Sequence, residues 1–157
     1  LMSEPEADLP AQVRDKALRL LTRREHSLEE LRQKLSQRGF PHDVISVVLQ
    51  ELKARGDLSD LRYAQAMVSH RAKKGYGPVY IRQELRERGV DSGLIESAII
   101  EGEFSWATVA LGRYKGDFKD EPIADYADWA RRASYLKRRG FETGTILEVL
   151  GEWVSPG

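Results

Sequence analysis

Apolar residues recur every three or four positions along most of the chain, which is the spacing of amphipathic helices. The pattern is clear in the first third of the sequence, at Val13, Ala17, Leu21, Leu28, Leu31, Leu35, Ile45, Val48, Leu49 and Leu52. The alternation of apolar and polar residues that is typical of strands is absent. The pattern therefore predicts an all-α protein.

The chain also repeats itself with a period of about fifty residues. The segments 31–40 and 81–90 share five of ten residues, and the segment 132–141 repeats their ending. We therefore expect three tandem three-helix repeats that form an elongated, curved array. The predicted boundaries are a disordered leader over 1–10, a first repeat over 11–56, a second over 57–102, and a third over 103–157 that contains an acidic linker insertion.

The repeated ending has a structural explanation. A glycine after the last helical residue takes a left-handed conformation, and the residue behind it contacts the helix's last turn, in the cap known as the Schellman motif. An arginine precedes each glycine, where its charge favours the helix dipole. We interpret the shared residues as a fold signature rather than a binding site: Leu35, Gly39, Phe40, Leu85, Gly89, Val90, Leu136, Gly140 and Phe141.

Local signals define three helices in each repeat. We expect helices over 11–23, 28–38 and 41–55, then over 60–74, from 78 towards 89 and from 92 to 101, and then over 104–114, 123–139 and 143–153. Ser27 and Glu30 have the spacing of a capping box, and Pro78 suits the first turn of a helix. An acidic linker over 115–122 is expected in the third repeat, whose three tryptophans are interpreted as core residues.

Composition narrows the possible functions. The 157 residues include 25 Lys and Arg, 25 Asp and Glu, three His and no Cys, so cysteine-based metal sites, disulfides and thiol chemistry are excluded. Neither a signal peptide nor an apolar stretch of membrane-spanning length occurs. Phosphate-binding loops, dinucleotide-binding motifs and catalytic motifs are also missing. We expect a soluble, cytoplasmic protein that is not an enzyme and uses no cofactor or metal.

The net charge of zero conceals local patches of opposite charge. Residues 71–88 and 131–139 are locally basic, whereas residues 101–128 hold seven acidic and three basic residues. Tyr76 lies between two glycines beside a lysine pair, where it would stack on a base or partner side chain, or else pack on the following helix. The alternative is that these basic side chains only form the solvent-exposed faces of amphipathic helices and bind no partner. The candidate contact residues are Arg32, Arg71, Lys73, Lys74, Tyr76, Arg82, Arg86, Arg131, Arg132, Lys137 and Arg138.

The chain resembles the RecX family, regulatory proteins of the RecA recombinase. The resemblance is carried by the segments 61–64, 74–78 and 81–90 of the middle repeat and by the Arg-Gly-Phe endings of the outer two. It implies a protein that binds the RecA–DNA filament, in its helical groove, and inhibits the ATPase, strand-exchange and coprotease activities of RecA. Contact with single- or double-stranded DNA would then be weak or through the filament, and we expect a monomer. A stand-alone DNA-binding helical protein and a protein-only helical adaptor remain alternatives.

Overall fold

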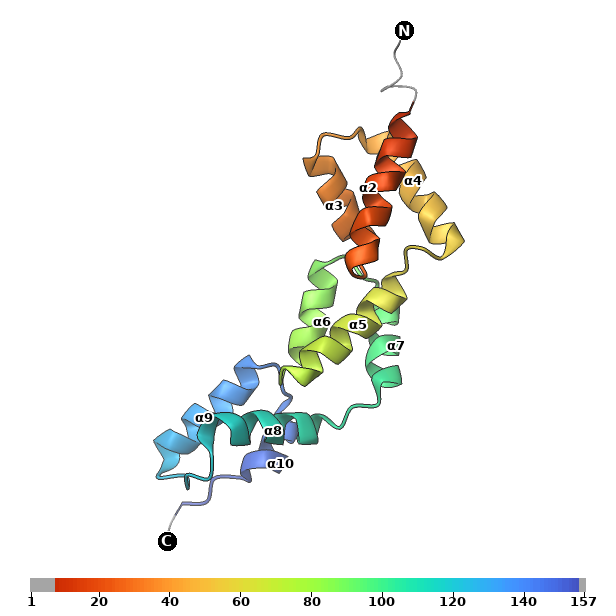
Figure 1. The fold of residues 1–157 in the computed structure, drawn as a ribbon. Helices are drawn as coiled ribbons and strands as arrows, with labels where there is room; N and C mark the ends of the chain where they lie inside the picture. Colours follow the sequence, from red (N-terminus) through yellow and green to blue (C-terminus); the bar gives the residue numbers. More distant parts are fainter. Residues whose placement is uncertain (1–7, 156–157) are drawn as a thin grey trace.

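The computed structural model describes residues 8–155, and within that range the regular secondary structure is entirely helical. Figure 1 shows three groups of helices in a row, with α2 to α4 at one end of an elongated molecule and α8 to α10 at the other. The first unit contains α2 (Leu9–Arg23), α3 (Leu28–Gln37) and α4 (His42–Arg55); the second contains α5 (Asp60–Lys73), α6 (Pro78–Glu87) and α7 (Ser92–Gly102); the third contains α8 (Trp106–Phe118), α9 (Tyr126–Arg138) and α10 (Thr143–Leu150).

Each unit packs around its own apolar core. Leu31 and Leu49 belong to the first core, Ile81 and Ile95 to the second, and Leu136 to the third; each of these residues is almost fully buried. Burial of such side chains contributes roughly 1.5–3 kcal/mol each to folding. The predicted fold class, an elongated, curved array of three-helix repeats, is confirmed.

The predicted glycine caps are present at the end of the second helix of every unit. Gly39, Gly89 and Gly140 have φ angles of 89°, 80° and 95°. The following residue donates its backbone N–H to the carbonyl of the leucine five positions earlier, at 3.4, 3.1 and 3.2 Å respectively. These bonds define Schellman caps, which is the local structure predicted for the repeated residues.

Several expected helix limits need correction. The helix α2 begins at Leu9, because Pro10 fits its first turn, so the predicted leader is too long; residues 1–7 lie outside the described part. The helix α8 continues to Phe118, whose ring packs against Tyr114 and Tyr135, and this leaves a shorter acidic linker. The helix α10 ends at Leu150, before Gly151. The boundaries assigned to the repeats stay a prediction.

The three tryptophans are only half-buried. Trp106 packs against both the second and the third core, and therefore joins two units rather than filling one. The indole N–H of Trp129 donates to the Gly151 carbonyl at 3.0 Å. Tyr126 contacts the rings of both Trp129 and Trp153. These two tryptophans thus hold the C-terminal segment against α9.

Neighbouring units meet in the same way at both junctions. The cap residue before α3, Ser27, donates its hydroxyl to the Arg88 carbonyl at the end of α6, at 2.8 Å. The cap residue before α6, Gly77, donates its backbone N–H to the Arg139 carbonyl at the end of α9, also at 2.8 Å. The N-termini of α3 and α6 therefore each contact the end of the second helix of the following unit.

Candidate functional site

Three of the arginines predicted to contact a partner instead form ion pairs with glutamates of their own units. Arg71 forms two hydrogen bonds with Glu84, both at 2.7 Å, and Arg82 forms two with Glu96, at 2.8 and 3.1 Å. Arg32 is bonded in the same two-pronged way to Glu29. Such bonds raise the pKa of each arginine, and they cancel most of its charge at the surface. The local positive charge counted along the sequence is therefore much smaller in the folded protein.

Arg132 was wrongly predicted to be a contact residue. Its side chain is 3% exposed and forms an ion pair with Asp128 at 3.0 Å. It also donates to the Tyr114 hydroxyl at 2.7 Å and to the carbonyls of Glu121 and Pro122. The guanidinium therefore fixes the acidic linker to α9 and α8 instead of facing a partner.

The same cluster lowers the pKa of the Asp128 carboxyl group. A backbone N–H from Ala124 and the guanidinium of Arg132 hold the pKa of Asp128 at about 2, well below its ordinary value. Arg131 also bonds to Asp128, at 2.7 Å, although most of its side chain remains exposed. Of the two adjacent arginines, only Arg131 is placed where it can contact a partner.

Tyr76 also differs from its proposed stacking role. Its ring stacks on Tyr80 of α6 with centroids 4.2 Å apart, and the Arg139 guanidinium lies 3.9 Å from its centroid. The half-buried ring is thus occupied by the following helix and by the third unit, which matches the packing alternative. Tyr76 serves as a joint between units, and it is not an open platform for a base.

Exposed cations that form no ion pair within residues 8–155 occur in all three units, and four of them lie near the second junction. Lys73 and Lys74 end α5, and Lys137 and Arg138 lie at or near the end of α9. Arg139 joins these two ends, because its side chain donates to the carbonyls of Lys74 and Gly75. Two basic segments some sixty residues apart in sequence are therefore brought together, and we call these four side chains the junction cations. Arg86 is also exposed, on α6.

A shallow groove lies beside Lys73 and Lys74. It has a volume of about 340 Å³, and its α8 side is formed by Thr108, Gly112 and Gly116. Arg113 also lines it and is paired with Asp117. Small residues on one wall and lysines on the other leave room for an extended anionic ligand, such as a phosphate backbone or an acidic protein surface.

The contact of Arg139 with the second unit was not predicted from the sequence. The signal was available, because Arg139 holds the same place before Gly140 that Arg88 holds before Gly89. Arg88 likewise crosses a junction, where it bonds to Glu30 at 2.9 Å. An arginine at this position therefore reaches the preceding unit, in addition to its effect on the helix dipole.

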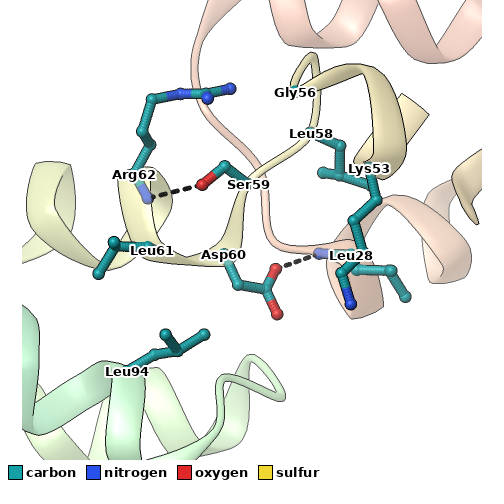
Figure 2. A pocket seen from close by; sticks show the side chains of 9 residues that line it. All are labelled: Leu28, Lys53, Gly56, Leu58, Ser59, Asp60, Leu61, Arg62 and Leu94. Atoms are coloured by element: carbon teal, nitrogen blue, oxygen red, sulfur yellow. Dashed lines mark hydrogen bonds between the residues drawn. The ribbon is translucent and has the colours of Figure 1, made fainter. Parts of the chain in front are cut away.

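A pocket at the first junction is structural (Figure 2). Asp60 accepts the backbone N–H of Leu28 at 2.8 Å, and Ser59 accepts that of Arg62 at 3.1 Å, while Leu61 and Leu94 lie across from them. The polar groups that Figure 2 shows at its centre are thus used to cap two helices. The arrangement connects the units.

Among the described residues, no helix is long and apolar enough to cross a bilayer. Over the same residues, no three His, Cys, Asp or Glu side chains lie together as metal ligands. The fold and the junction cations define a class of protein: an all-helical array of three-helix units with basic surface at a joint.

Comparisons with known proteins agree with that class and narrow it. A model described as "RecX, first three-helix domain" matches residues 14–52, and "RecX, second three-helix domain" matches residues 59–99. The chain is 43% identical to the regulatory protein RecX of Halorhodospira halophila over 92% of this chain and 89% of that protein. It is 38% identical to the regulatory protein RecX of Legionella pneumophila over 88% and 92% of the two chains.

Solved structures show the same fold. The crystal structure of RecX from Lactobacillus salivarius superposes with a TM-score of 0.74 at 19% identity, over 91% of this chain and 95% of that one. A crystal structure of regulatory protein RecX gives 0.76 at 20% identity, over 93% and 73% of the two chains. The chain belongs to the RecX family of regulatory proteins.

Proposed function

We propose that this protein regulates a RecA recombinase by binding along the RecA–DNA filament, and that it acts as a monomer in the cytoplasm. It inhibits ATP hydrolysis, strand exchange and coprotease activity by occupying the filament, and it has no catalytic activity of its own. The membership of the RecX family is the observation that carries this proposal.

The shape and charge of the molecule support the proposal. An elongated array can contact several subunits of a repeating partner at once, and such contacts restrict the movements that accompany nucleotide turnover. The junction cations provide an anion-binding surface midway between the second and third units. With 25 basic and 25 acidic residues, the protein lacks the bulk charge that strong binding of naked DNA requires.

The test is the single-stranded-DNA-dependent ATPase rate of RecA during titration with this protein at two salt concentrations, beside its binding to naked DNA. We expect inhibition at protein concentrations well below those that coat the DNA. Inhibition only after the DNA is covered, with a steep salt dependence, would instead identify a stand-alone DNA-binding protein. An absence of any effect on RecA by the folded protein would favour an adaptor for other proteins.

The junction cations should contribute to this inhibition. The double variant Lys73→Gln with Lys74→Gln removes two exposed charges that have no ion partner in the described structure. We expect the half-inhibitory concentration to rise roughly fivefold, since an exposed charge contact is worth about 0.5 kcal/mol. The matched control, Arg23→Gln with Lys53→Gln, removes two exposed charges without an ion partner from the first unit and should leave inhibition unchanged. Equal effects of the two double variants would exclude a specific role for this junction.

A further inference from the structure

The end of a second helix is the surface by which one unit contacts the unit before it. At both junctions this end, with its arginine, its capping glycine and the apolar residue that follows, contacts the start of the preceding unit's second helix. We call it the joining surface. In the first unit it consists of Arg38, Gly39 and Phe40, and Gly39 has the same left-handed conformation as Gly89 and Gly140. Figure 1 shows the loop between α3 and α4 on the side of the first unit that faces away from the second.

The first junction shows what a joining surface can bind. Ser27, the cap residue of α3, donates its hydroxyl to the Arg88 carbonyl at 2.8 Å. Glu30, three residues later, accepts from the Arg88 guanidinium at 2.9 Å. Ser27 and Glu30 are both buried, and a Cβ on Gly89 would lie 2.7 Å from the side chain of Glu29. The surface therefore receives a helix start that has a hydroxyl at its cap and a carboxylate three residues later.

The second junction uses the same acceptor with a different donor. The Arg139 carbonyl accepts the backbone N–H of Gly77, at 2.8 Å. A Cβ on Gly77 would lie 2.7 Å from the ring of Phe141, so the same helix start covers this apolar side chain, which is 2% exposed. The carbonyls at a helix end carry partial negative charge and the N–H groups at a helix start carry partial positive charge, so the two attract each other. A donor to the arginine carbonyl is thus common to both junctions.

The same groups are unused at the end of α3. Within residues 8–155, the Arg38 carbonyl accepts no hydrogen bond, and the exposed Arg38 guanidinium forms neither a hydrogen bond nor an ion pair. Nothing lies within 4 Å of the place where a Cβ on Gly39 would be. Phe40 is only half-buried, whereas its equivalents Val90 and Phe141 are buried. An acceptor, a cation and an apolar ring are therefore available together on the same kind of cap.

We propose that the end of α3 docks the start of a helix of a partner protein, one with a serine or threonine at its cap and a glutamate three residues later. The hydroxyl donates to the Arg38 carbonyl, the carboxylate accepts from the Arg38 guanidinium, and the first turn of the partner helix covers Phe40. Desolvation and the nearby charge of Arg38 lower the pKa of Lys16, so a second cation lies close by and adds to the attraction. The argument uses neither RecA nor DNA, and its failure would leave the proposed regulation of RecA standing.

The described helices of a second copy of this chain do not supply such a helix start. Among them, only α3 begins with a serine that is followed three residues later by a glutamate. That serine, Ser27, is already bonded to Arg88. Residues 1–7, outside the described part, contain Ser3 and Glu6 at this spacing, so the experiment has to distinguish them from a partner.

The test uses nuclear magnetic resonance on the full chain, with an N-acetylated, alanine-rich peptide that begins Ser-Leu-Glu-Glu as the probe. A length of about 20 residues allows the peptide to form a helix by itself. We expect saturable shifts of the Gly39 amide and of the Arg38 side-chain signals, and no shift of the Gly89 amide, because α3 already contacts that helix end. A counterpart that begins Ala-Leu-Glu-Gln lacks both polar partners and should bind about tenfold more weakly.

Two single variants make the test specific. Arg38→Gln removes an exposed charge that has no partner among the described residues, so it should unfold at the same denaturant concentration as the parent and bind the peptide about fivefold more weakly. The matched control, Arg23→Gln, removes another exposed cation of the first unit and should bind as the parent does. Equal losses in the two variants would reveal only attraction by net charge, and an unshifted Gly39 at millimolar peptide would show that nothing docks there. Either result would overturn the proposal.

Two further measurements distinguish the other occupants. Shifts of the Gly39 amide when the concentration of the chain alone is raised would identify a second copy as the occupant. The double variant Ser3→Ala with Glu6→Gln keeps the chain at full length, and peptide binding that appears only in this variant would assign the surface to residues 1–7. Each of these results would contradict docking of a partner. Constant Gly39 signals in the concentration series and equal peptide affinity of the double variant and the parent would support it.

Discussion

Arg132 shows how one side chain can serve the fold in a position that looks available for binding. Its four acceptors come from α8, the linker and α9, so the conformation of the third unit depends on it. Its neighbour Arg131 contacts Asp128 and remains mostly exposed. The two arginines therefore form a natural comparison between a structural and a surface cation.

Replacing the structural arginine should destabilise the third unit. We expect Arg132→Met to lower the free energy of unfolding by about 2 kcal/mol, because four oxygens lose a charged hydrogen-bond donor. Arg131→Met, made as the control, should have no measurable effect, since exposed ion pairs contribute little. Chemical denaturation of both variants measures the difference, and equal midpoints would contradict the assigned role of Arg132.

His26 is a second residue whose surroundings fix its chemistry. It is 1% exposed, and the Lys34 ammonium lies 3.0 Å from Nε2 while the Arg24 carbonyl lies 3.1 Å from Nδ1. Because an ammonium can only donate, Nε2 accepts and Nδ1 carries the proton. Burial, followed by the charges of Arg24 and Lys34, lowers the pKa of His26, although the hydrogen bond to the Arg24 carbonyl and the charge of Glu30 oppose this.

The lowered pKa of His26 predicts a loss of stability in mild acid. In the unfolded chain histidine titrates near about 6.5, so the unfolded state binds the proton first as the pH falls. The stabilising contribution is complete above that pH and is lost as the pH falls towards the lower pKa of the folded protein. Denaturation midpoints between about pH 7 and 5 should fall, and less steeply for His26→Gln. Parallel pH profiles for the two proteins would disprove this.

At the scale of helices, the capping glycines differ in what surrounds them. Gly39 has nothing within 4 Å of the place where a Cβ would lie, whereas a Cβ on Gly140 would lie 2.5 Å from the Tyr80 backbone nitrogen. Both residues are left-handed. The same cap is therefore an isolated turn at the first unit and part of a unit junction at the third.

Alanine substitutions should separate these two roles. Gly39→Ala introduces only the left-handed strain, about 1 kcal/mol. Gly140→Ala adds a collision with backbone of the preceding unit, so we expect it to be clearly more destabilising and to weaken the junction. Thermal unfolding of the two variants provides the comparison; a Gly140 variant no less stable than the Gly39 variant would contradict the close packing.

The helices and their caps could be predicted from the sequence because they depend on residues close together in the chain. The apolar period and the glycine endings are local signals of this kind. The pairing of Arg82 with Glu96 and the burial of Arg132 depend instead on which helices meet, and one sequence alone does not contain that information. The gathering of Lys73 with Lys137 likewise follows from the junction geometry and not from the charge count.

At the scale of the whole molecule, the three cores are joined by narrow contacts, which gives the extended outline in Figure 1. A compact protein of 157 residues would have a radius of gyration near about 15 Å. Small-angle X-ray scattering should therefore give a clearly larger value, with an asymmetric distance distribution that does not change with protein concentration. A value at the compact limit would show that the units fold back on one another.

The start of α9 differs from the starts of α3 and α6. Ser27 and Gly77, which receive the following unit, lie twelve residues before their capping glycines, and Asp128 holds the same place before Gly140. Asp128 lies inside a lengthened helix, and its carboxylate already bonds to Ala124, Arg131 and Arg132. The residue at this position in the third unit is thus already engaged within α9 and its linker, whereas Ser27 and Gly77 bond to the following unit. Among the described residues, the contact that joins neighbouring units is therefore made at the starts of α3 and α6 and not at the start of α9.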